Sequence, residues 1–227
     1  MKYLPPTLLG IAYASRLFQE IDAPSSYDAF LKRVAPSVNL RVPDHSGGLL
    51  EWLNKWGCRI GKNRFDELRP KLADWFSKWE PDLPPAEIEI AEVATASSLS
   101  RFEGAYEELK VCGFGPTATS KILFAVRPKS AIPWDAPIRE AFGLSDDGDA
   151  YTAMLERCCE EARKLLEEAE RHGIADIPRE VARAEGRTLV RLLDEYHWIT
   201  ITEGHQVPDR EELARWLSLA ASRWTRN

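Results

Sequence analysis

The chain has 227 residues, of which 44% are hydrophobic, enough for the core of one large domain or two small ones. Its net charge of −6 excludes a uniformly basic nucleic-acid binder but not a locally basic one. Each apolar run is shorter than the ~18 residues that a membrane span needs, so we expect no membrane partner.

Apolar residues recur at helical spacing along almost the entire chain, and prolines and glycines separate the segments. The pattern predicts helices over 7–21, 26–35, 46–56, 64–79, 86–95, 99–111, 116–127, 135–142, 149–172, 178–196 and 209–224. Residues 198–202 have the pattern of a strand, but they are too few to found a sheet. We therefore predict an all-α fold of two intimately packed helical subdomains.

The first residues admit two interpretations. Lys2, an apolar run over 8–14 and the sequence Ala-Tyr-Ala at 12–14 imitate a signal peptide. Pro5 and Pro6 interrupt that run and Arg16 follows it at once, which favours an amphipathic helix. We therefore expect a cytoplasmic protein.

The cysteines and histidines show no spacing typical of a metal site. The four cysteines, at 58, 112, 158 and 159, include no C-x₂-C pair, and the four histidines form no H-E-x-x-H motif. We expect reduced cysteines, no metal and no cofactor.

Charge is distributed unevenly along the chain. Residues 55–71 hold six basic and two acidic side chains, and residues 110–139 hold five basic and one acidic. Residues 140–180 hold twelve acidic and five basic side chains. The predicted helices over 149–196 are therefore expected to form a solvated outer layer or a surface for a partner.

Residues 99–127 predict two helices joined by a tight turn. Gly113, Phe114 and Gly115 form the turn, and Pro116 opens the second helix, where its fixed φ is harmless. Glycines permit positive φ and leave no side chain in the way, so backbone N–H groups can converge at the positive end of the helix. Such a cradle binds phosphate. Further phosphate contacts are expected from Thr117, Ser120 and Lys121. An ordinary hairpin with glycine caps is the alternative.

One carboxylate follows this hairpin among apolar neighbours. Asp135 comes after Trp134, and Pro137 lies where the first turn of the next helix is expected. Asp135 is therefore predicted to cap that helix, and the same position could tune it for chemistry.

The hairpin and this carboxylate together resemble the helix-hairpin-helix DNA glycosylase superfamily. The resemblance rests on Gly-Phe-Gly-Pro-Thr-Ala at 113–118 and Ile-Pro-Trp-Asp-Ala-Pro-Ile at 132–138, and it covers about 99–142. It implies that Asp135 is the catalytic aspartate and that the hairpin grips the DNA backbone. A positional match at 49–60 implies that Asn54, Trp56 and Arg59 lie near the gap left by an extruded base. Trp134 could stack on that base.

The resemblance also implies a domain organisation, and the sequence departs from the family pattern in places. The whole chain, 1–227, is expected to be one glycosylase-like unit. Its central part is 45–142, with the hairpin at 99–127 and the catalytic loop at 128–139, while 1–44 and 143–227 form the second subdomain. The lysine of strand-cleaving members falls at Thr117, which implies a monofunctional enzyme, although Lys121 lies one turn further on. Iron–sulfur cysteines are absent, and 149–227 matches no repair branch.

The function implied is hydrolysis of the bond between a modified base and its sugar in double-stranded DNA, by a monomer. The base is either damaged or a hypermodified base of phage DNA, such as glucosylated hydroxymethylcytosine. A non-catalytic DNA-binding module and a purely structural helical protein remain as alternatives.

Overall fold

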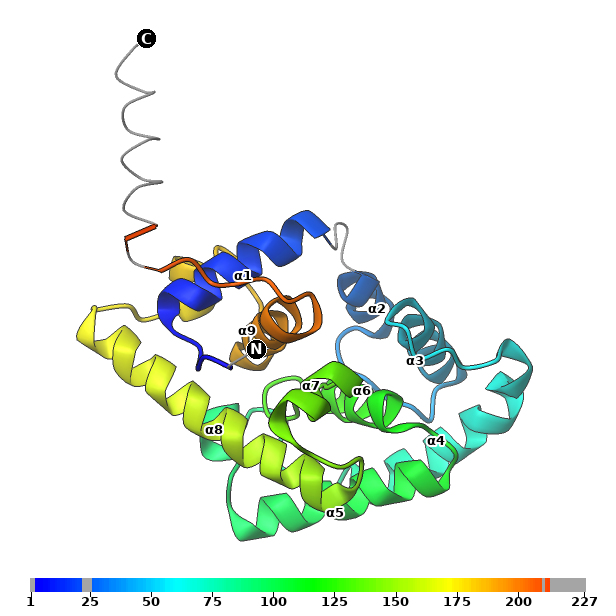
Figure 1. The fold of residues 1–227 in the computed structure, drawn as a ribbon. Coiled ribbons are helices and arrows are strands. Elements are labelled where there is room, and N and C mark those ends of the chain that lie inside the picture. Colours follow the sequence, from blue (N-terminus) through cyan, green and yellow to red (C-terminus); the bar gives the residue numbers. More distant parts are fainter. Residues whose placement is uncertain (1–2, 22–25, 210, 213–227) are drawn as a thin grey trace.

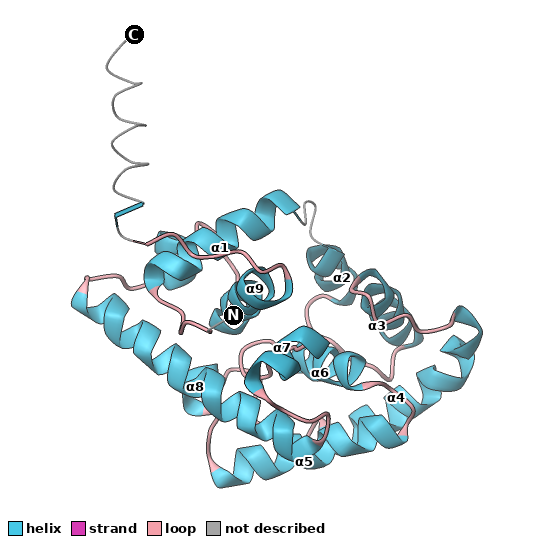
Figure 2. Cartoon of the chain, viewed as in Figure 1, coloured by secondary structure: helices cyan, strands magenta, loops and turns pink. Residues whose placement is uncertain are grey.

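The computed structural model describes residues 3–21, 26–209 and 211–212, and throughout these ranges the regular structure is helical, without strands (Figure 2). The all-α prediction is therefore confirmed. In chain order the elements are α1 (Leu8–Ile21), α2 (Ser26–Val34), α3 (Pro43–Lys55), η1 (Lys62–Arg64), α4 (Phe65–Trp79), η2 (Ile90–Glu92), α5 (Ala96–Val111), α6 (Pro116–Val126), α7 (Ala136–Phe142), α8 (Gly148–Arg171), η3 (Ile177–Val181), α9 (Leu189–His197) and η4 (Trp198–Thr202). The helix predicted over 209–224 lies almost wholly outside the described residues.

The helices form two groups that meet around α6 and α7 (Figure 1). Helix α1 packs against α9 in one group, and α2 packs against α3 in the other. The long helix α8 runs along α5 and covers η2. Helix α6 is buried from Ala118 to Val126 except at Lys121, so it forms the centre of the molecule.

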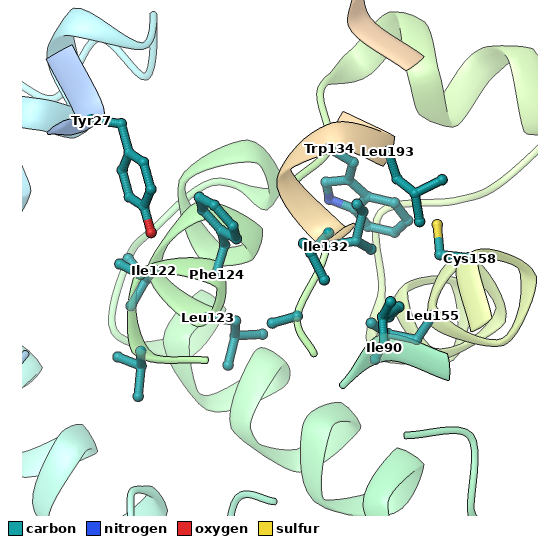
Figure 3. Packing of buried hydrophobic residues seen from close by; sticks show 14 of the residues in the cluster. Tyr27, Ile90, Ile122, Leu123, Phe124, Ile132, Trp134, Leu155, Cys158 and Leu193 are labelled. Carbon is teal, nitrogen blue, oxygen red and sulfur yellow. The ribbon is translucent and has the colours of Figure 1, made fainter. Parts of the chain in front are cut away.

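Buried aromatic side chains join these groups. Figure 3 shows Trp134 beside Leu193 of α9, with Cys158 of α8 nearby, and Tyr27 of α2 over Phe124 of α6. The ring centroids of Tyr27 and Phe124 are 4.9 Å apart, while Trp134 makes an edge-to-face contact with Tyr151 at 5.3 Å. These contacts draw four helices and the loop before α7 into a common core.

Three predicted elements were wrong. The helix predicted over 86–95 is only the short turn η2, because Pro84 and Pro85 favour extended backbone before it. The helix predicted over 178–196 is divided into η3 and α9, and Gly186 between them has φ +80°. The strand-like residues 198–202 form a wide helical turn that continues α9, in which Glu203 N–H donates to the Trp198 carbonyl over 2.9 Å.

The expectation of a solvated layer over 149–196 fails for α9. Every residue from Leu189 to His197 is buried, including Arg191, Asp194, Glu195 and His197. These side chains pair with one another and with α8: Arg191 Nη1 binds Asp194 over 2.6 Å, and His197 Nε2 lies 3.0 Å from Glu161 Oε2. Pairing offsets the free-energy cost of burying these charges. The composition alone does not indicate this pairing. Among the described residues no helix is both long and apolar enough to cross a membrane.

Candidate active site

A cavity of about 960 Å³ opens between the two helix groups. The hairpin and the start of α7 form one wall, the loop after α3 forms a second, and α1, α9 and η4 form a third. Its lining includes the side chains of Phe18, Trp56, Arg59, Arg64, Lys121, Asp135, Arg191, Asp194 and Trp198. Cations thus outnumber carboxylates in a partly aromatic pocket.

The hairpin presents open backbone to this cavity. Gly113 has φ +97°, in the region that favours glycine, whereas Gly115 has φ −74° and needs no glycine for its conformation. A Cβ atom on Gly115 would meet nothing within 4 Å. Pro116 begins α6, no side chain caps this end, and the first N–H groups of a helix lack intrahelical partners. Phe114 is buried and anchors the turn, so Gly115 and Thr117 offer an anion site at the pocket's edge.

Asp135 lies at the N-terminus of α7 and faces the same cavity. Its Oδ1 accepts the N–H of Ile138 over 3.1 Å, as the N-cap prediction requires. The hydroxyl of Thr202 donates to the same carboxylate, 3.2 Å from Oδ1 and 3.0 Å from Oδ2. The carboxylate is thus half-buried, fixed from two sides and open to the pocket.

Two residues expected at the site make structural contacts, although Trp134 also borders the cavity. The buried Ser120 hydroxyl accepts the Trp134 N–H over 3.1 Å, so it ties the loop before α7 to α6 and does not line the cavity. Trp134 is 1% exposed, and its Nε1 donates to the Pro116 carbonyl over 3.3 Å. These bonds fix Asp135 relative to the hairpin and leave the Trp134 ring packed in the core.

The two basic segments of the sequence meet at the cavity. Lys121 Nζ donates to the Trp56 carbonyl over 2.7 Å and lies 5.1 Å from the centroid of the Trp56 ring. Arg64 Nη2 and Lys71 Nζ each approach a hairpin carbonyl, those of Gly113 and Cys112, at 3.5 Å. Trp56 is therefore a fixed wall of the pocket, and Lys121 projects into the cavity from a buried helix.

Asn54 positions the loop after α3 but does not line the cavity. Its side chain makes two hydrogen bonds with the backbone of Ile60, of 2.6 and 2.8 Å. This clamp closes a turn in which the exposed Arg59 has φ +52°, an uncommon conformation for a residue other than glycine. Lys55 and Arg59 line the cavity, and neither forms an ion pair with the described residues.

The sequence patterns did not predict that any residue of the third wall would line a site. Phe18 comes from α1, Arg191 and Asp194 come from α9, and Trp198 comes from η4. Arg191 Cζ lies 4.6 Å from the Phe18 ring centroid and 4.7 Å from that of Trp56. Burial raises the pKa of Asp194 against the opposing effects of Arg191 and Lys121. The charged residues of α9 were the only sequence signal for this wall. In the sequence, however, they look like the exposed face of a helix.

One buried group of side chains has the composition of a metal site, away from the cavity. Cys158, Glu161 and His197 bring their ligand atoms within 4.8 Å of one another. Glu161 already accepts the Tyr3 hydroxyl over 2.6 Å and lies against His197. Burial raises the pKa of the Cys158 thiol well above its ordinary value, which opposes the thiolate that a metal binds. Glu161 and His197, together with Tyr3, form a hydrogen-bonded tie between α8, α9 and the N-terminal segment.

Compared with protein-family models, curated proteins and solved structures, the chain has no match.

Proposed function

We propose that the protein is a monofunctional DNA glycosylase that hydrolyses the bond between a modified base and its deoxyribose. The observation that carries the proposal is that Asp135 and the Gly113–Gly115 hairpin face one cavity. The spacing of these two features is that of the helix-hairpin-helix glycosylases. The cationic lining suits a phosphate backbone, and the aromatic wall suits an extruded base.

In the proposed reaction a carboxylate and a water molecule act on the sugar. As the base departs, positive charge develops at C1′ and the ring oxygen, and ionised Asp135 stabilises it. Asp135 also orients a water molecule whose oxygen bonds to C1′. The hydroxyl stays on the sugar, the remaining proton neutralises the base, and an abasic site results. Thr202 and the Ile138 N–H hold the carboxylate in place during this step.

The remaining residues bind the DNA around that step. Backbone N–H groups near Gly115 receive a phosphate, and Thr117 adds a hydroxyl at the same helix end. Arg59, presented by the Asn54 clamp, enters the gap that the base leaves. Lys121 projects from α6 beside Trp56, where it contributes positive charge. If the test below gives strand breaks without alkali, Lys121 is instead the nucleophile of a strand-cleaving reaction.

The test is a search for abasic sites with matched variants. Asp135→Asn keeps a residue that caps helices well and removes only the charge, so the fold should persist. Asp147→Asn is the control, because Asp147 caps α8 in the same manner, with its Oδ1 2.9 Å from the Ala150 N–H. Duplexes with damaged bases and phage DNA with hypermodified bases are incubated with each protein and then treated with alkali.

We expect alkali-sensitive sites from the wild type and Asp147→Asn, and a loss of at least about 100-fold in Asp135→Asn. The substrate that yields them decides between a damaged and a hypermodified base. Strand breaks without alkali would make Lys121 a nucleophile. Equal activity of Asp135→Asn would contradict the proposed role of its carboxylate.

A non-catalytic DNA-binding module is the second candidate, because Asp135 is a functioning N-cap with the geometry of an ordinary one. That function predicts DNA binding that weakens with salt and no abasic sites on any substrate.

A further inference from the structure

The third wall of the cavity contains a carboxylate with one oxygen unused. Asp194 lines the pocket, yet its side chain is only 12% exposed. Its Oδ2 accepts Arg191 Nη1 over 2.6 Å, while Oδ1 has no partner among the described residues. Because an ionised carboxylate is only an acceptor, this oxygen is open to an N–H donor.

Arg191 adds a second unused group at the same place. Its Nη2 is buried without a hydrogen-bond partner in the described part of the chain. The guanidinium is fixed between the rings of Phe18 and Trp56 and by ion pairs with Asp194 and Glu195. A buried donor beside a nearly buried acceptor costs free energy unless a ligand satisfies both.

The other titratable groups around Asp194 do not satisfy it. Lys121, Asp135 and His197 act on it through charge, and no hydrogen bond joins any of them to its carboxylate within the described ranges. Burial has the largest effect, and it raises the pKa of Asp194. A donor that enters the pocket would therefore stabilise the ionised carboxylate.

We propose that Asp194 and Arg191 read the edge of the extruded base, and that the substrate base carries an exocyclic amino group beside a ring nitrogen or carbonyl oxygen. The amino group donates to Asp194, and its neighbouring acceptor binds Arg191. An oxo group in place of the amino group would face the carboxylate with a second acceptor, so a deaminated base should bind less tightly than its amino counterpart. This inference rests on the proposed function, since it places the base in the same cavity.

The test measures binding without cleavage. Asp135→Asn protein is titrated with duplexes that each carry one base opposite an abasic analogue, so that pairing does not hold the base in the stack. The bases form matched pairs: cytosine and uracil, adenine and hypoxanthine. We expect the amino member of each pair to bind at least about tenfold more tightly. Adding Asp194→Asn, which both donates and accepts, should reduce the ratio to within about twofold.

Two controls make the result decisive. Asp147→Asn, added in place of Asp194→Asn, should leave the preference unchanged. If thermal melting shows that Asp194→Asn does not fold, Asp194→Ser takes its place, because a hydroxyl also both donates and accepts.

Equal binding within the pairs, or a preference that survives in the folded Asp194 variant, would overturn this assignment. The proposed function would stand in either case if the wild type makes abasic sites. Absence of salt-sensitive DNA binding would remove both.

Discussion

Thr202 connects η4 to the carboxylate on which the proposed chemistry depends. Its hydroxyl lies within 3.2 Å of both Asp135 oxygens, although the two residues are 67 positions apart. A hydroxyl that fixes a reacting carboxylate acts on the rate more than on binding, because small misplacements at a reacting atom are costly.

Thr202→Val is therefore expected to lower the rate of abasic-site formation about tenfold or more while the Kd for DNA stays within about twofold. Valine keeps the shape of threonine and removes only the donor. Thr202→Ser should restore the rate, since it keeps the hydroxyl. Single-turnover kinetics and a binding titration separate the two effects, and a loss confined to Kd would contradict the positioning role.

The two hairpin glycines provide a second test, because they differ in the backbone conformation that each requires. Gly115→Ala should fold normally, since its φ of −74° suits alanine and its Cβ would meet only open space. That open space is where the phosphate is expected, so the variant should weaken DNA binding about tenfold. Urea denaturation and a binding titration would separate folding from binding.

Gly113→Ala is the contrasting control for that prediction. Its φ of +97° strains alanine by about 1–2 kcal/mol, and its Cβ would lie 2.9 Å from Arg64 Nη2. This variant should lose stability, which Gly115→Ala should not. Unchanged DNA affinity in Gly115→Ala would contradict the phosphate site.

Among the elements, α9 departs furthest from its expected role. Burial raises the pKa of Glu195 to about 7 from an ordinary value of 4.5, in spite of its ion pairs with Arg187 and Arg191. Because the folded state holds this proton more tightly, the stabilisation is complete below pH 4.5 and is lost as pH rises toward 7.

The free energy of unfolding should therefore fall by up to about 3 kcal/mol between pH 4.5 and pH 7.5 through Glu195. Glu195→Gln should fall less over this range, since glutamine does not titrate. Glu170→Gln, which changes an exposed carboxylate on α8, is the control and should behave as the wild type does. Urea denaturation at both pH values measures the difference, and identical slopes in all three proteins would contradict the assignment.

The sequence predicted some elements of the structure well and others not at all. Local signals predicted the hairpin, the N-cap at Asp135 and most helix positions, because turn glycines, prolines and apolar spacing act over a few residues. The roles of Ser120 and Asn54 depend on which side chain reaches which carbonyl. Arg191 and Asp194 reach the cavity, and Thr202 reaches Asp135, only because α9 packs against α1 and η4 against α7, which no local pattern specifies.

Over the whole molecule, folding concentrates positive charge that the sequence spreads over two segments. Lys55, Arg59 and Arg64 come from one segment and Lys121 from the other, and all line one cavity of a chain whose net charge is −6. Seven of the twelve acidic residues in 140–180 lie in α8, which lies along α5. Such a separation of charge orients the molecule toward a polyanion.

DNA affinity should therefore fall steeply with salt, and Lys55→Gln should reduce the slope of log K against log salt by about 0.9. Lys164→Gln removes an exposed lysine of α8, outside the cavity lining, and should leave the slope unchanged. Fluorescence anisotropy at several salt concentrations gives both slopes. Equal slopes for the two variants would contradict binding at the cavity.

The ties that hold the third wall connect distant parts of the chain. Thr202 binds Asp135 across 67 positions, Tyr3 binds Glu161 across 158, and the Tyr196 hydroxyl binds the Leu4 carbonyl across 192. Closing loops of that length is slow compared with forming a local hairpin. During synthesis on the ribosome, the hairpin at Gly113–Gly115 can therefore form well before the cavity exists. We expect the nascent chain to bind DNA before it can act on it, because the chemistry also needs α9 and η4, which are made later.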